Sequence, residues 1–75
     1  MSTEEVFAVN CKTVKRYLKP LLYNLNPIYI EADLVKTIAG TEYVIITRQD
    51  GKELPIEVTD QAASDIVKIV MNELF

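Results

Sequence analysis

The first third of the chain has the hydrophobic spacing of an amphipathic helix. Between residues 3 and 25, apolar side chains recur at alternating intervals of four and three residues, which places them on one helical face. The predicted buried stripe consists of Phe7, Cys11, Val14, Leu18, Leu21 and Leu25. Ser2, followed three residues later by Glu5, fits a capping box at the start of this helix. Pro20 has no backbone N–H and its ring opposes a preceding carbonyl, so we expect a kink or a break near Lys19.

Two segments admit a second interpretation. Glu5 to Val9 also fits a short strand, in which case Asn10 caps a helix that begins at Cys11. Residues 27–39, predicted below to form a strand and the start of a turn, also fit a helix that ends at the following glycine. Both alternatives stay open at the level of the sequence.

Residues 28 to 58 are predicted to form three antiparallel strands in a meander. Apolar and polar side chains alternate along much of this segment, with the period of two that is typical of half-buried strands. Ala39-Gly40 is a candidate two-residue turn, and Asp50-Gly51 is a strong hairpin signal because both central positions of such a turn need positive φ. The middle strand is then 42–48. Pro55 cannot donate a hydrogen bond to a neighbouring strand, so the third strand is expected at the edge.

The two predicted turns determine how the strands pair. A two-residue turn in each hairpin places Val35 opposite Val44, and Ile46 opposite Pro55. Arg48 then lies between Glu31 and Glu53, in a row of alternating charge. One face of the predicted sheet collects Ile30, Ala32, Leu34, Tyr43, Ile45, Leu54, Ile56 and Val58. The other face collects Val35, Val44, Ile46 and Pro55.

The chain is predicted to end in a second helix, which Thr59 or Asp60 caps. Its buried stripe consists of Ala63, Ile66, Val67, Val70 and Leu74. Ile69, Met71 and Phe75 fall outside that stripe, so this helix is apolar around more of its circumference than a one-sided helix needs. The predicted fold class is therefore α+β. A single domain over residues 1–75 has an N-terminal helix, a three-stranded antiparallel meander and a C-terminal helix in two layers.

The composition excludes most catalytic and metal-site chemistry. The 75 residues include no histidine and one cysteine, so the usual general base, an intrachain disulfide and a Cys/His zinc site are all ruled out. Two isolated glycines cannot build a phosphate-binding loop. Cys11 lies on the apolar stripe, where a free cysteine behaves as a small buried hydrophobe rather than as a nucleophile. We expect no enzymatic activity, no cofactor and no metal.

Charge is unevenly distributed along the chain. The net charge is −3, yet four of the eight basic residues lie within eight positions without an intervening acid. They are Lys12, Lys15, Arg16 and Lys19. This stripe is typical of a solvated helical face, and it also fits a surface that binds nucleic acid or another anion. The acidic residues Glu31, Asp33, Glu53 and Glu57 could hold a hard cation, although a charge-paired sheet face is the favoured interpretation.

Small size directs the functional interpretation toward association. A chain of 75 residues buries only about 60–65% of its unfolded surface, and oligomerisation is one of the few remaining means of stabilising it. No signal peptide or membrane span is evident, so we expect a soluble, cytoplasmic protein. The favoured function is a protein-interaction module that self-associates, as a homodimer, or docks on a larger protein, inhibition of that protein being one form of such docking. In size and architecture it resembles small acidic accessory proteins of bacteria and phages.

The expected interface follows from the apolar surplus on the sheet and on the last helix. It comprises Val35, Val44, Ile46, Pro55, Met71 and Phe75. The alternative function is nucleic-acid binding through the basic stripe of the N-terminal helix.

Overall fold

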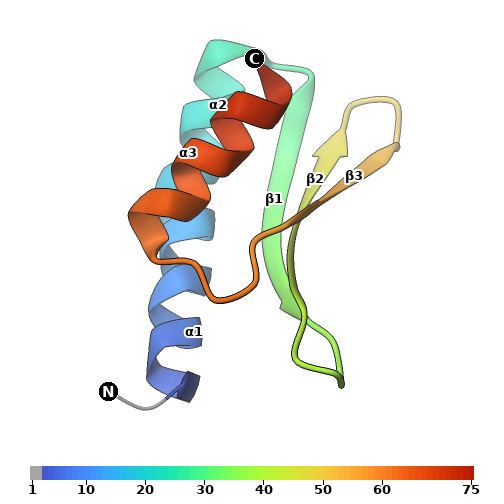
Figure 1. Ribbon diagram of the computed structural model, residues 1–75. Coiled ribbons are helices and arrows are strands. Elements are labelled where there is room, and N and C mark those ends of the chain that lie inside the picture. The colour runs from blue at the N-terminus through green and yellow to red at the C-terminus, as the bar shows by residue number, and fades with distance from the viewer. Residues whose placement is uncertain (1–2) are drawn as a thin grey trace.

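The computed structural model describes residues 3–75 and contains helices packed on one antiparallel sheet (Figure 1). Its elements in chain order are α1 (Thr3–Thr13), η1 (Val14–Leu18), α2 (Lys19–Leu25), β1 (Tyr29–Lys36), β2 (Glu42–Arg48), β3 (Glu53–Glu57) and α3 (Ala63–Leu74). The strands lie in the order β1-β2-β3. The α-β-β-β-α order and the α+β class are thus confirmed. The alternative strand at residues 5–9 and the alternative helix at 27–39 are wrong, and the capping box at Ser2 lies outside the described residues.

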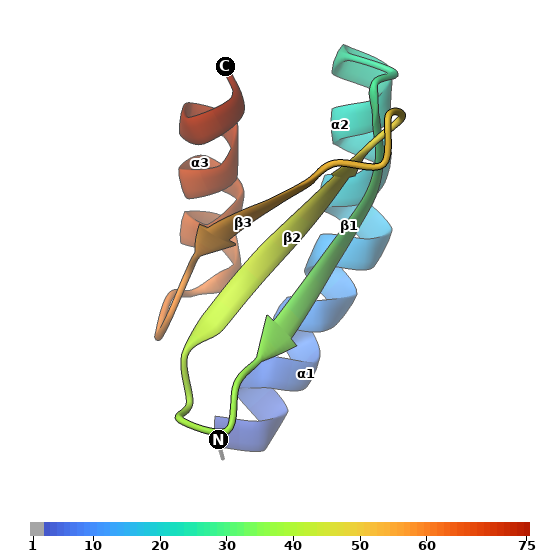
Figure 2. The same ribbon diagram turned by 90° about the vertical axis from the view of Figure 1, so that its right-hand side faces the viewer.

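All the helices lie on the same face of the sheet. The segments α1, η1 and α2 form one long helix beside β1, and α3 lies nearer to β3 (Figures 1 and 2). The hydrophobic core fills the space between the two layers. Its members are Val14, Leu18, Leu22, Ala32, Leu34, Val44, Ile46, Ile56, Val58, Ile66 and Val70.

The long helix passes Pro20 without breaking, because the turn before it is π-helical. The N–H of Lys19 donates to the carbonyl of Val14, five residues earlier instead of four. This wider turn lies just before Pro20 and makes room for the proline ring. The expected disruption near Lys19 therefore takes the form of an expanded turn. The extra residue also rotates the buried face, so that Leu22 is buried while Leu25, which was predicted to be buried, is 53% exposed.

Both hairpins have turns of three residues, not two. In the first, the N–H of Thr37 donates to the carbonyl of Thr41, and Gly40 ends the turn with φ of 92°. In the second, the N–H of Arg48 donates to the carbonyl of Lys52, and Gly51 has φ of 87°. A glycine in the left-handed region at the last position is typical of three-residue hairpin turns.

The added turn residue moves each strand pairing by one position and reverses the faces of β2. Leu34 pairs with Val44, and Val44 pairs with Ile56. Because side chains alternate between faces, this shift directs Val44 and Ile46 into the core. The second shift cancels the first, so the side chains predicted to point inward on β1 and β3 are correct with one exception. Ile30 is 40% exposed and lies beside an irregularity in the pairing of β1 with β2.

The loop between β3 and α3 is fastened to the start of β2 through Glu42. This residue is only 7% exposed, and its carboxylate accepts the N–H of Asp60, which has a left-handed φ of 59°. The N–H of Glu42 donates in turn to the hydroxyl oxygen of Thr59. Thr59 and Asp60 thus hold the loop to Glu42 and do not cap α3, so the predicted cap is wrong. The residue before α3 is Ala62, with no side-chain cap.

The faces of β2 can be tested by truncating two neighbouring isoleucines. Ile46→Ala should lower the free energy of unfolding by about 2–5 kcal/mol because it leaves a cavity in the core. Ile45→Ala, on the opposite face, should cost at most about 1 kcal/mol. Urea titration at a protein concentration too low for self-association measures both values. The reverse order of the two costs would contradict the strand register described here.

Candidate functional site

The side of the sheet that faces away from the helices is the candidate functional site. No helix within residues 3–75 covers it, and in Figure 2 the strands lie in front of the helices. We call this side the outer face. Three cross-strand rows make it up: Glu31, Thr47 and Glu53; Asp33, Ile45 and Pro55; and Val35, Tyr43 and Glu57.

The centre of the outer face is apolar and its margins are charged. Val35 is 41% exposed and Pro55 is also exposed, whereas Tyr43 and Ile45 are half-buried between neighbouring strands. Acidic side chains flank this centre along both outer strands. An apolar centre with a polar margin is the usual composition of a protein–protein contact surface.

Only part of the interface predicted from the sequence lies on this face. Val35 and Pro55 do, but Val44 and Ile46 are 0% exposed, so they cannot contact a partner in this fold. Their places are taken by Tyr43 and Ile45, which were predicted to lie on the opposite face of the sheet. The error has one physical cause, the length of the two turns. The glycine at the end of each turn does not reveal it, because glycine suits three-residue turns as well as two-residue ones.

The two expected interface residues of the C-terminal helix are separated from the outer face. Met71 is half-buried and packs against the core, because α3 lies on the helical side of the sheet. Phe75 is 62% exposed, and its ring meets Tyr29 edge to face with 6.1 Å between centroids. The structure therefore does not bring Met71 and Phe75 together with Val35 and Pro55.

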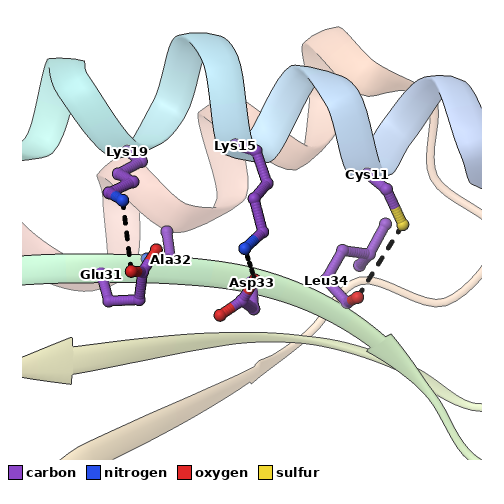
Figure 3. Close-up of polar contacts among 7 residues, drawn as sticks. All are labelled: Cys11, Lys15, Lys19, Glu31, Ala32, Asp33 and Leu34. Carbon is purple, nitrogen blue, oxygen red and sulfur yellow. Dashed lines mark hydrogen bonds and ion pairs between the residues drawn. The ribbon is translucent and has the colours of Figure 1, made fainter.

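Two lysines of the long helix reach across to the edge of β1, as Figure 3 shows. Lys15 Nζ lies 2.6 Å from Asp33 Oδ1, and Lys19 Nζ lies 3.2 Å from Glu31 Oε2. The spacings match, since four helical residues rise about 6 Å and two strand residues rise about 6.6 Å. That match is the sequence signal for these ion pairs. The hydrogen bond from Lys15 to Asp33 raises the pKa of the lysine.

Side chains also bind two backbone groups of the β1 edge. Glu31 Oε1 accepts the N–H of Ala32 at 3.2 Å, while its other oxygen binds Lys19. The thiol of Cys11 donates to the carbonyl of Leu34, with 3.8 Å between sulfur and oxygen. The long helix thus covers the strand edge that could otherwise pair with another chain.

Ion pairs within the molecule engage two of the four residues of the basic stripe. Lys12 and Arg16 form no ion pair with any of the described residues, whereas Lys15 and Lys19 are both paired. The predicted row in which Arg48 separates two acids is wrong. Thr47 occupies that position, and Arg48 instead lies 3.4 Å from Asp50 in the turn.

Cys11 lies in surroundings that oppose ionisation of its thiol. Burial raises the pKa of Cys11, and the nearby carboxylates of Glu42 and Asp33 raise it further, against a smaller opposing effect of Lys15. A nucleophilic cysteine needs the reverse, because only the thiolate attacks. The arrangement keeps Cys11 protonated at neutral pH.

The remaining candidate sites include three open cavities. One, of about 340 Å³, is lined by Val6, Phe7, Asn10, Glu42, Asp60, Gln61 and Ala62. A second, of about 460 Å³, adjoins the β1 margin of the outer face and is lined by Lys15, Lys19, Pro20, Tyr23 and Ile30. A third, of about 220 Å³, lies between β3 and α3 and is lined by Leu54, Pro55, Ile56, Glu73 and Leu74. Within residues 3–75, no group of three or more acidic or cysteine side chains is arranged to hold a metal ion. In the same part of the chain, no helix has the length and hydrophobicity that crossing a bilayer requires.

Comparison of the chain with protein-family models, with curated proteins and with solved structures finds no match in any of the three.

Proposed function

We propose that this protein is a non-enzymatic interaction module of the accessory or regulatory kind, and that the outer face is its working surface. Through this face it self-associates or docks on a larger protein.

The observation that carries the proposal is that β2 is apolar on both of its faces. Val44 and Ile46 point into the core, while Tyr43 and Ile45 point to the outer face. Continuous apolar runs are typical of strands that are covered on both sides. The helices cover one side, and no segment within residues 3–75 covers the other. A second chain would supply that cover.

Association through the strand edges is disfavoured by the same structure. On the edge of β1, Glu31 and Cys11 bind one backbone donor and one backbone acceptor, as described above. Between β2 and β3, the backbone N–H of Val58 donates to Glu42 and that of Arg48 donates to Lys52. Hydrogen-bonded and non-hydrogen-bonded residue pairs alternate along an antiparallel ladder, so the backbone nitrogen of Pro55 faces the free edge of β3. That edge therefore lacks a donor at its centre. Charged side chains and an edge proline are common means of preventing strand addition.

Nucleic-acid binding by the basic stripe receives less support from the geometry. Binding strength depends on the number of phosphates that basic side chains neutralise. Two of the four basic residues are already neutralised by Asp33 and Glu31. The remaining two, Lys12 and Arg16, make a small contact surface on a chain whose net charge is negative.

A matched pair of substitutions tests whether the outer face is the working surface. Ile45→Glu places a charge at the centre of this face, whereas Ile38→Glu makes the same change in the first turn, at a fully exposed position. Affinity capture from lysate, with each variant and the wild type as bait, should show partners that Ile45→Glu loses and Ile38→Glu keeps. Circular dichroism confirms that both variants are folded. Equal capture by all three baits would contradict the proposal.

Gel-shift titration tests the rival function. With mixed-sequence DNA and RNA at low salt we expect no shifted band, since Lys15 and Lys19 are engaged in ion pairs. A band that weakens steeply with added salt, and that disappears on Lys12→Ala and Arg16→Ala substitution, would instead establish nucleic-acid binding through the stripe.

The reactivity of Cys11 tests the absence of covalent catalysis. Because the pKa of this thiol is raised, its labelling by a maleimide at neutral pH should be slower in the native protein than in the urea-unfolded chain. The rate should rise with pH as the thiolate fraction grows, and it should level off only at pH values above the usual thiol pKa. Native labelling faster than that of the unfolded chain would show an activated thiolate and reopen the case for an enzyme.

A further inference from the structure

We infer that the cavity between the start of α1 and the loop before α3 binds a primary ammonium group on an alkyl chain. This is the chemistry of a lysine side chain or of a free alkylamine. The cavity has a volume of about 340 Å³, and we call it the Glu42 cavity. It lies on the helical side of the sheet, because Glu42 shares its face of β2 with Val44, so the inference does not depend on the outer face.

Three segments that are far apart in the sequence meet at the Glu42 cavity. Asn10 Nδ2 donates to the carbonyl of Gln61 at 3.0 Å, which joins α1 to the loop before α3 (Figure 1). Glu42 Oε1 accepts the N–H of Asp60 at 3.1 Å, which joins the same loop to β2. These bonds hold the polar groups of the cavity in place before a ligand arrives, and a preorganised site binds at a lower cost in entropy.

Glu42 is a buried acid that lacks a cation. The residue is only 7% exposed, and no basic side chain within residues 3–75 forms an ion pair with it. Within the same residues, its carboxylate accepts the single N–H of Asp60 on Oε1, which leaves Oε2 without a donor. Removing a carboxylate from water is costly unless a cation pairs with it. A bound ammonium group would supply the missing partner.

Asn10 supplies a second acceptor. It is 3% exposed, and its amide nitrogen binds Gln61, whereas its Oδ1 accepts no hydrogen bond from residues 3–75. In this part of the chain, Arg48 Nε is the only fully enclosed side-chain polar atom without a partner, so Asn10 Oδ1 and Glu42 Oε2 both remain accessible. Both residues line the cavity. An ammonium group has three donors and no acceptor, so it can satisfy both oxygens.

The apolar part of the lining suits an alkyl chain better than a metal ion. Val6, Phe7 and Ala62 form this part of the wall, and contact with them would remove the methylene groups of the ligand from water. A calcium ion needs about six to eight oxygen ligands. The carboxylates that line the cavity are those of Glu42 and Asp60 alone, which favours an organic cation.

A lysine of the chain lies in this region without neutralising Glu42. Lys36 pairs with Glu42 across β1 and β2, yet its Nζ lies over the ring of Phe7, 5.2 Å from the ring centre. It forms no ion pair within residues 3–75 and does not line the cavity. The negative face of an aromatic ring attracts a cation, so a residue of the cavity wall already attracts an ammonium group.

The starts of the two neighbouring helices are already matched with acids. A helix N-terminus carries partial positive charge, which favours nearby carboxylates. Glu4 and Glu5 lie in the first turn of α1, and Asp65 lies in the first turn of α3. Asp60 adds a further acid to the cavity wall. The surroundings of the cavity are therefore acidic, which raises the local concentration of cations.

NMR titration of isotope-labelled protein with n-butylammonium chloride tests the inference. The backbone amide signals of Asp60 and Gln61 and the side-chain amide signals of Asn10 should shift saturably at neutral pH. We expect a dissociation constant in the millimolar range, because the ligand has few atoms. n-Butanol has the same alkyl chain without the charge, so it should bind at least about tenfold more weakly. Equal binding of the two compounds would overturn the ammonium site.

Two cavity variants and one matched control locate the binding. Glu42→Gln keeps an oxygen that can accept the N–H of Asp60 but loses the charge, so it should weaken n-butylammonium binding about tenfold or more. Glu53→Gln, the same change at the far end of β3, should leave the affinity unchanged.

Ala62→Leu fills the cavity without changing its charge, and it should also abolish binding. This variant keeps the test decisive if Glu42→Gln does not fold, which circular dichroism detects. Wild-type affinity in either folded cavity variant would overturn the inference.

Two further probes identify the source of the ammonium group. N-acetyl-lysine N-methylamide presents it as a protein does, so binding as tight as that of n-butylammonium supports a lysine of a partner protein. Binding of n-butylammonium alone assigns the cavity to free alkylamines. Calcium chloride that shifts the same signals at lower concentration than either amine would overturn the organic cation. Ile45→Glu, on the opposite face of the sheet, should not alter amine binding, so failure here is distinguishable from failure of the proposed function.

Discussion

The structure depends on one constraint, the length of the two turns that flank β2. Gly40 and Gly51 each end a three-residue turn in the left-handed region, and together they determine which side chains of β2 point inward. Every consequence for packing follows from this register, since a shift by one residue exchanges the two faces. It places Val44 and Ile46 in the core, and it leaves Ile45 at the centre of the outer face.

The long helix stabilises that arrangement from the edge of the sheet. Its two lysines bind the acids of β1, and Cys11 contacts a backbone carbonyl of the same strand. Ion pairs between exposed side chains contribute little to stability because solvent screens them, so their effect is mainly on specificity. They hold the helix over the strand edge, where it covers backbone groups that would otherwise be free. The same contacts occupy charges that would otherwise be available to an anionic partner, so the cover of the edge and the weak case for nucleic-acid binding have one cause.

Most of the fold could be predicted from the sequence, whereas about half of the site could not. The helices and strands follow from local periodicity. In β1, acids alternate with Ala32 and Leu34, so the sequence indicates which side chains point to the core. In β2, the positions on both faces are apolar, so periodicity cannot detect a shift of one residue. Only the turn geometry decides between Ile45 and Ile46, and a glycine fits turns of both lengths. The π-helical turn before Pro20 also could not be predicted from residue spacing. The sequence shows that a proline disturbs the helix, but not that the backbone accommodates it by widening one turn.

Protected edges together with an open face decide what kind of association this molecule can form. An open strand edge adds further chains without limit, because each added strand presents a new edge. Here Pro55 interrupts one edge, and Glu31 and Cys11 bind backbone groups of the other. A face, by contrast, is used up by the one partner that covers it. The proposed docking through the outer face would therefore give a finite complex rather than a fibre.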